Sequence, residues 1–157
     1  MPFTTPLVVR RVSPTHWELI APLSYQGAVD HFTVHDGLVT DFASVPRWLQ
    51  SFVQATGTWT GAAVLHDDFC IQLAAGNCAV SSSDADGIFR RVMDEEGVGF
   101  VRRWLMWTAV RWAALNNPAR RPGWLRDSPK VLAITLVLLA AVGAAVYGLD
   151  WLAHTIF

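Results

Sequence analysis

The clearest hydrophobic pattern in the chain is an apolar run close to its C-terminal end. Residues 131–149 read VLAITLVLLAAVGAAVYGL and include no charged residue and no proline. A helix of this length rises about 30 Å, which matches the thickness of a hydrocarbon core. We therefore expect a single transmembrane helix. The alternative is a central buried helix of a soluble protein, but so short a chain can hardly surround a helix that is apolar on every side.

Basic residues lie on one side of this run only. Four of them precede it: Arg120, Arg121, Arg126 and Lys130. No Lys or Arg follows it, and the titratable side chains beyond it are Asp150 and His154. By the positive-inside rule, the N-terminal part faces the cytoplasm. We expect a domain over residues 1–117, a basic linker over 118–130, the membrane span over 131–149 and a short tail over 150–157.

The N-terminal third of the chain has the composition of short strands. Residues 6–12, 16–25 and 28–40 are rich in Val, Thr, Tyr, Trp and Phe, and turn-forming segments interrupt them. Asp36-Gly37 is a good tight-turn pair. These segments predict antiparallel strands and hairpins.

After Asp41 the hydrophobic period changes to that of helices. We expect one helix from Pro46 to about Ala55 and a second over residues 58–75. The segment SSSDADGIFRRVMDEEG predicts a third, with Ser83 and Asp86 spaced as a capping box. Its other expected features are Gly97 as the C-terminal cap and one apolar face made by Ile88, Phe89, Val92 and Met93.

A fourth helix, over residues 100–115, completes the predicted domain. Its expected apolar stripe is Val101, Trp104, Leu105, Trp112 and Leu115, and its expected polar surface is Arg102, Arg103 and Arg111. We expect the stripe to pack on the core. An alternative surface for membrane or partner binding consists of Trp104, Trp107, Arg111 and Trp124. The predicted fold class is α+β, a small antiparallel sheet packed against three to four helices and followed by one C-terminal transmembrane helix.

Composition narrows the possible functions. The chain has 157 residues, enough for one domain, and 12 basic against 13 acidic side chains, so no basic excess indicates nucleic-acid binding. The two cysteines, Cys70 and Cys78, form no CxxC pair, and the N-terminal segment lacks the pattern of a secretory signal. We expect both thiols to be small buried hydrophobic groups.

One histidine falls on an apolar helix face. At 100° per residue, His66 lies in the stripe of Ala62, Ala63, Phe69, Cys70 and Leu73, with Asp67 at its edge and Asp68 opposite. A buried imidazole costs about 1 to 3 kcal/mol unless a partner satisfies it. The candidate partners are three carboxylates: Asp41, Asp84 and Asp86.

Two interpretations of these residues remain open. Asp41, His66, Asp67 and Asp86 would together suit a divalent metal that activates water, or a carboxylate-held histidine would act as a general base without metal. Alternatively, Asp41 with Ser44 caps the helix that begins near VPRWL, and Asp86 serves its capping box. Cys70 is either a ligand or nucleophile, or an inert buried thiol. Signatures of other enzymes, GxSxG, GxxxxGK[ST], GxGxxG and HExxH, are absent.

Three blocks of the sequence resemble a small family of unknown function found in phages and prophages. They are GLVTDFASVPRWL, GAAVLHDDFC and SDADGIFRRVMDEEGV, within a likeness that spans about residues 6–115. Asp68 and Cys70 depart from the family pattern, and the apolar run lies beyond its ordinary extent. The family's polar motif positions are Asp41, Ser44, Arg47, His66, Asp67 and Asp86.

The resemblance implies a phage or prophage origin and a site, but no reaction. In one reading the protein is a membrane-anchored, metal-dependent hydrolase: His66, Asp67 and Asp41 are catalytic, Ser44 and Arg47 orient the substrate, and Asp86 completes a hypothetical metal set. In the other it is a non-enzymatic virion-assembly, tail-associated or lysis-related membrane component, with the His/Asp cluster as a structural clamp. The expected partners are the membrane and other phage proteins, not nucleic acid, and the only cofactor that the residues suggest is a divalent metal.

Overall fold

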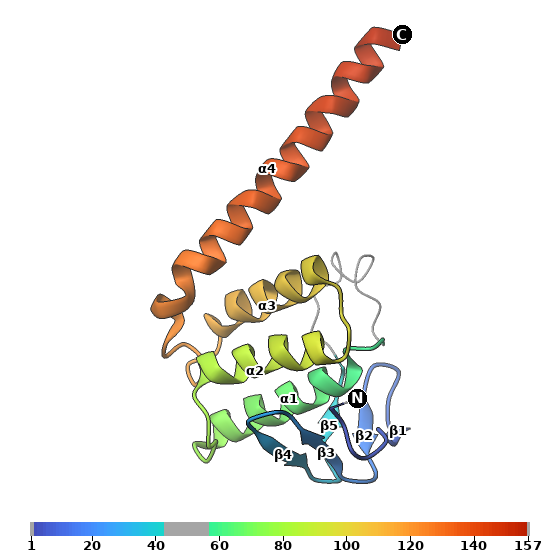
Figure 1. Cartoon of the computed structure of the whole chain (residues 1–157), viewed down its shortest axis with the longest axis vertical. Helices are drawn as coiled ribbons and strands as arrows, with labels where there is room; N and C mark the ends of the chain where they lie inside the picture. The colour runs from blue at the N-terminus through green and yellow to red at the C-terminus, as the bar shows by residue number, and fades with distance from the viewer. Residues whose placement is uncertain (1, 43–56, 157) are drawn as a thin grey trace.

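The computed structural model describes residues 2–42 and 57–156 and confirms the predicted α+β class (Figure 1). The helix expected from Pro46 to about Ala55 lies outside the described residues. The strands are β1 Val9–Arg11, β2 Trp17–Leu19, β3 Leu23–Gln26, β4 His31–Val34 and β5 Val39–Thr40. The helices are α1 Thr60–Ala75, α2 Ser82–Glu95, α3 Phe100–Ala114 and α4 Trp124–Ile156.

The strands form two small antiparallel sheets, one in the order β1-β2-β5 and one that pairs β3 with β4. Two stretches predicted to form strands and hairpins, residues 16–25 and 28–40, each contain two strands. Pro22 separates β2 from β3, because proline cannot donate a ladder hydrogen bond. Gly37, with φ +88°, makes the predicted turn, but this turn carries the chain from β4 in one sheet to β5 in the other.

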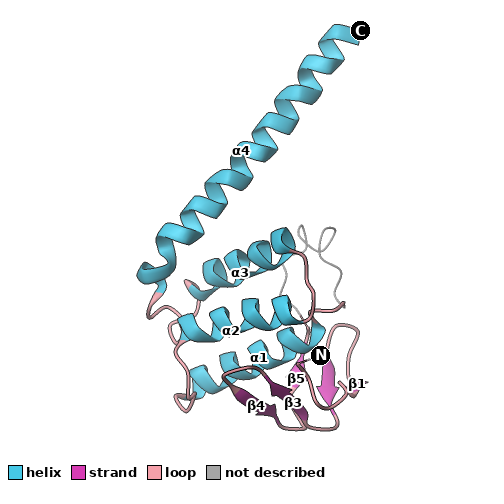
Figure 2. Cartoon of the chain, in the orientation of Figure 1, coloured by secondary structure: helices cyan, strands magenta, loops and turns pink. Residues whose placement is uncertain are grey.

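The first three helices lie side by side, with α2 between α1 and α3 (Figure 2). The sheets lie on the α1 side, where β4 contacts α1. The core contains Leu19, Tyr25 and Val34 from the strands, with apolar residues of α1 and α2. The predicted apolar face of α2 is confirmed, since all four residues are buried: Ile88, Phe89, Val92 and Met93.

The start of α2 differs from the prediction. The N-cap is Ser81, whose hydroxyl accepts the N–H of Asp84 and donates to the Asp84 carboxylate over 2.6 Å. The capping box expected at Ser83 and Asp86 is therefore wrong by two residues. Three consecutive serines offer three possible caps, and only tertiary packing selects among them. At the other end, Gly97 has φ +76° and ends the helix as predicted.

The buried stripe of α3 also differs from the predicted one. Its buried residues are Met106, Trp107, Thr108, Arg111 and Ala114. Val101 and Trp112, both expected in the core, are 66% and 37% exposed. A membrane-lying surface that includes Trp107 and Arg111 is thus wrong, because the domain covers both side chains.

α4 extends away from the domain (Figure 1) and is long and apolar enough to cross a membrane. Only 6% of its most apolar window is buried, which is unlike a core helix of a soluble protein. It begins at Trp124, inside the stretch expected to be linker, and contains Pro129. Pro129 cannot donate to the carbonyl of Leu125, but the hydroxyl of Ser128 does so over 2.8 Å. The helix therefore continues through the proline.

Candidate functional site

His66 is buried, as its place on α1 predicts, and a carboxylate meets it. Its Nε2 lies 2.5 Å from Oδ1 of Asp86 on α2, and the two side chains are 7% and 0% exposed. The ring also contacts Phe89, with centroids 4.8 Å apart. Of the three candidate partners, Asp86 is thus the one bonded to His66. Asp84 is exposed and serves the helix cap.

Asp86 also binds two arginines that the sequence reading placed elsewhere. Nη1 of Arg111 donates to its Oδ2 over 2.7 Å, and Nη2 of Arg120 donates to its Oδ1 over 2.8 Å. Arg111, expected on the surface of its helix, is 0% exposed, and Arg120, expected in the linker, is 8% exposed. Both carboxylate oxygens of Asp86 are therefore occupied by positively charged or hydrogen-bonding partners.

The same network reaches the first turn of α4. Nε of Arg111 lies 3.3 Å from Oδ2 of Asp127, and the hydroxyl of Ser83 donates to that carboxylate. Ser82 adds a bond from its hydroxyl to the carbonyl of Arg120 over 2.7 Å. We call His66, Asp86, Arg111, Arg120 and Asp127 the charged clamp. It joins α1, α2, α3, the connection before α4 and α4 itself.

Burial and ion pairing have opposite effects on the pKa values of His66 and Asp86. Burial lowers the pKa of His66, but the hydrogen bond to Asp86 and the neighbouring Cys70 outweigh it and raise the pKa to about 9. Burial raises the pKa of Asp86, but His66, Arg120 and Arg111 outweigh it and lower the pKa below its usual value. At neutral pH the pair is therefore an imidazolium bound to a carboxylate. An imidazolium cannot accept a proton, so this histidine is poorly suited to be a general base.

Asp67, the neighbour of His66 in sequence, belongs to a separate site. Its Oδ2 accepts the hydroxyl of Thr40 over 2.5 Å, and the Thr40 oxygen accepts the backbone N–H of Phe42 over 2.9 Å. Phe42 has φ +64°, a strained conformation for a bulky residue. The Asp67–Thr40 pair therefore holds the turn that follows Asp41.

An open pocket of about 270 Å³ lies beside this pair, lined by residues that include Asp41, Asp67 and Cys70. Burial raises the pKa of Asp67, the Thr40 hydrogen bond and the charge of His66 oppose this, and the nearby charge of Asp41 raises it further. Cys70 Sγ lies 3.8 Å from Nδ1 of His66, so it stands between the clamp and the pocket. We call Asp41, Asp67 and Cys70, with the space beside them, the Asp67 pocket.

The residues predicted to share one site are thus divided between two. His66 and Asp86 lie in the charged clamp, Asp41 and Asp67 line the pocket, and Ser44 and Arg47 lie outside the described residues. Within residues 2–42 and 57–156, no three His, Cys, Asp or Glu side chains are grouped as metal ligands. The catalytic and metal-binding roles of these residues stay predictions.

Three clamp residues were missed as site residues: Arg111, Arg120 and Asp127. A signal for Arg111 exists, since it follows Trp107 by four residues and precedes Ala114 by three, the spacing of one helix face. Arginine is usually exposed, which is why the apolar stripe was placed elsewhere. No comparable signal exists for Arg120 and Asp127, which lie among other charged residues before the apolar run.

The fold and the site define a small α+β domain. Its three helices and α4, which is long and apolar enough to cross a membrane, meet at the buried charged clamp. Residues 17–110, more than half of the chain, match a family described as protein of unknown function (DUF1353), and the chain belongs to that family. No curated protein and no solved structure matches this chain. The matched segment contains His66 and Asp86, whereas Arg111, Arg120 and Asp127 follow it.

Proposed function

We propose that the protein is a non-enzymatic membrane component of phage or prophage type, in which the His/Asp cluster is a structural clamp. The observation that supports this most strongly is the state of Asp86. Its side chain is 0% exposed, and its two oxygens are bonded to His66, Arg111 and Arg120. Because each oxygen already has a charged partner and the side chain has no exposed surface, this carboxylate is poorly placed to bind a substrate, a water or a metal.

The position of the clamp supports a mechanical role. It joins the helical domain to α4 through Asp127, which is buried and lies next to Arg111. Removing one partner from a buried ionic network leaves an uncompensated charge and costs several kcal/mol. The network therefore holds the apolar helix in one orientation relative to the domain. A protein that presents a domain at a membrane surface requires such a fixed connection.

The setting of the domain follows from α4 and its flanking charges. The helix is long and apolar enough to cross a membrane, and the basic residues precede it. We place the domain on the cytoplasmic side, by the positive-inside rule. Virion assembly, tail association and lysis are the roles at a bacterial membrane that suit such a component, with other phage proteins as its partners.

Metal content and stability together test the clamp. The full chain is purified in detergent without chelator, its metal content is measured by mass spectrometry, and its thermal unfolding is followed. We expect no stoichiometric metal, and a large loss of stability in both His66→Ala and Asp86→Ala. Stoichiometric metal that Asp41→Ala or Asp67→Ala abolishes without loss of stability would contradict the clamp and favour an enzyme.

The second candidate function is a hydrolase-like activity in the Asp67 pocket. The observation that favours it is a carboxylate with a raised pKa, Asp67, beside a second one, Asp41, at an open pocket. Such a pair can donate and accept protons, or offer oxygen ligands to a divalent metal. In this candidate Ser44 and Arg47 orient the substrate, and Asp41 and Asp67 are the acid and base groups or the metal ligands.

A further inference from the structure

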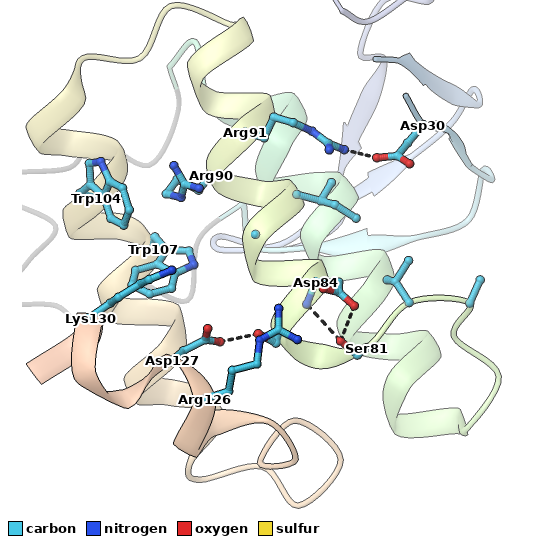
Figure 3. A pocket seen from close by; sticks show the side chains of 15 residues that line it. Asp30, Ser81, Asp84, Arg90, Arg91, Trp104, Trp107, Arg126, Asp127 and Lys130 are labelled. Atoms are coloured by element: carbon cyan, nitrogen blue, oxygen red, sulfur yellow. Dashed lines mark hydrogen bonds and ion pairs between the residues drawn. The ribbon is translucent and has the colours of Figure 1, made fainter. Parts of the chain in front are cut away.

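A second pocket, of about 530 Å³, lies where α4 leaves the domain (Figure 3). Its walls come from α2 with the residues just before it, α3, the first turns of α4, and Asp30. Trp104 and Trp107 line it from α3, and Arg126 and Lys130 line it from α4. Arg90 lies over the Trp104 ring, 4.3 Å from its centroid. We call this space the interface pocket.

The charges of the interface pocket are not balanced. Of its three carboxylates, Asp30 is paired with Arg91, Asp127 belongs to the charged clamp, and Asp84 is bonded to Ser81. Within the part of the chain that the structure describes, neither Arg126 nor Lys130 has an ion-pair partner. The lining has four cations, Arg90, Arg91, Arg126 and Lys130, against three carboxylates, and this excess of one positive charge favours an anionic ligand.

The interface pocket lies at the level where the apolar part of α4 begins. Lys130 directly precedes Val131, the first residue of that part, and Val131 is fully buried against the domain. One turn further along, the hydroxyl of Thr135 accepts a hydrogen bond from Nε1 of Trp112 over 3.0 Å. The end of α3 therefore reaches beside the first apolar turn, and in a bilayer it stands at the headgroup level.

The side chains of the pocket suit that level. Tryptophan and basic residues concentrate at membrane–water interfaces, where a ring meets the acyl boundary and a cation meets phosphate. Each Lys or Arg near an anionic membrane surface strengthens binding by about fivefold. A headgroup phosphate that enters the pocket would meet Arg126 and Lys130 while its glycerol lies against the tryptophans.

We propose that the interface pocket binds the phosphate of an anionic phospholipid in the leaflet from which α4 enters the membrane. This rests on the proposed membrane anchoring, and it names the class of lipid that the anchored protein prefers. Free phosphate offers the same chemistry, but the two tryptophans and the start of the apolar part of α4 directly after Lys130 favour the lipid.

The test uses the full chain in neutral detergent micelles, so that its outcome does not depend on membrane insertion. Thermal unfolding is followed against increasing concentrations of a short-chain phosphatidylglycerol, the matching phosphatidylcholine, or inorganic phosphate. We expect phosphatidylglycerol alone to raise the melting temperature with saturation. In the double variant Arg126→Gln/Lys130→Gln, the apparent affinity should fall at least tenfold.

The matched control is Arg102→Gln/Arg121→Gln, which removes two exposed charges outside the pocket and should keep the affinity of the wild type. All four residues are exposed, so the melting temperatures without lipid should differ only by the small contribution of Arg102 over the Trp59 ring and of the bond from Arg121 to the Leu115 carbonyl. Equal effects of both phospholipids, equal loss in both double variants, or saturation by inorganic phosphate alone would overturn the proposal. Flotation with phosphatidylcholine vesicles tests the anchor separately, so failure of the anchor and failure of the pocket are distinguishable.

Discussion

Arg111 of α3 donates a hydrogen bond to Asp86 of α2 over 2.7 Å, and neither side chain is exposed to water. Asp86 gathers two arginines and a histidine, so the central charge of the domain is a carboxylate enclosed by cations. Apolar residues of the same volume would often stabilise a core as well as such a network does. We therefore expect the network to favour one arrangement of the four helices more than it adds net stability.

Removing the central carboxylate should destabilise the protein strongly. In Asp86→Asn, Arg111 and Arg120 lose a buried counter-charge, at a cost of about 3 to 5 kcal/mol. Urea unfolding of the full chain in detergent measures the change. Asp94→Asn is the matched control, because Asp94 is 55% exposed in its pair with Arg103 and should change stability by less than about 1 kcal/mol. Equal effects of the two variants would contradict the clamp.

Two adjacent arginines should respond differently to the same substitution. Arg120 is buried against Asp86, whereas Arg121 is exposed. Arg120→Met should lower the free energy of unfolding by about 2 kcal/mol, the scale of a charged hydrogen bond, and Arg121→Met by less than about 0.5 kcal/mol. Thermal melts of the pair give the comparison. Indistinguishable melting temperatures would place Arg120 outside the clamp.

The stability of the domain should fall as the pH rises. The pKa of His66 is raised from 6.5 to about 9 in the folded protein. Its pairing therefore stabilises the fold fully below pH 6.5, and this contribution is lost as the pH rises towards 9, by on the order of 3 kcal/mol. Unfolding at a series of pH values should show this slope in the wild type and in the exposed-site control His35→Gln, but not in His66→Gln. A slope that persists in His66→Gln would assign it to another group.

The turn at Phe42 should depend on one hydroxyl. Thr40→Val keeps the shape of the side chain but leaves the Asp67 carboxylate and the Phe42 N–H without that partner, at about 2 kcal/mol. Thr33→Val, in β4, is the control, because its hydroxyl makes only weak contacts of 3.3 and 3.5 Å. Chemical unfolding compares the stability of the two variants. If Thr40→Val has no effect on stability, the turn is held by other contacts.

The two cysteines report the orientation of the domain. Both are partly exposed, so the expectation that both thiols are buried is wrong, and neither forms a disulfide. With the domain in the cytoplasm, a membrane-impermeant maleimide should label the protein in bacteria only after the inner membrane is permeabilised. Labelling of intact spheroplasts would contradict this orientation and would place the domain outside the inner membrane. The variant that lacks both cysteines controls for background.

Local pattern predicted those features that depend on neighbouring residues. The apolar run became α4, the period of 100° per residue placed His66 in the core, and the apolar face of α2 was identified from spacing alone. Asp86 was correctly among the possible partners of His66, although as one of three carboxylates. These features can be predicted from the sequence, because they depend only on which residues share a helix face.

The arginines could not be predicted in the same way. Arg111 is buried because Asp86 and Asp127 meet it from other helices, and a sequence shows such long-range neutralisation only when the tertiary contacts are known. The choice of Ser81 as cap likewise depends on Ser82 and Ser83 being used in the interior, where they bond to Arg120 and Asp127. The division of the motif residues into clamp and pocket has the same origin.

The burial of Val131 and Asp127 fixes the first turns of α4 to the domain. In a bilayer thinner than the apolar part of the helix, a membrane helix adapts by tilting. With the charged clamp intact, a tilt of the helix would rotate the domain with it. Membrane thickness would thus set the orientation of both sheets relative to the membrane surface. The same chain would then present a different face to its surroundings in a thick and in a thin membrane.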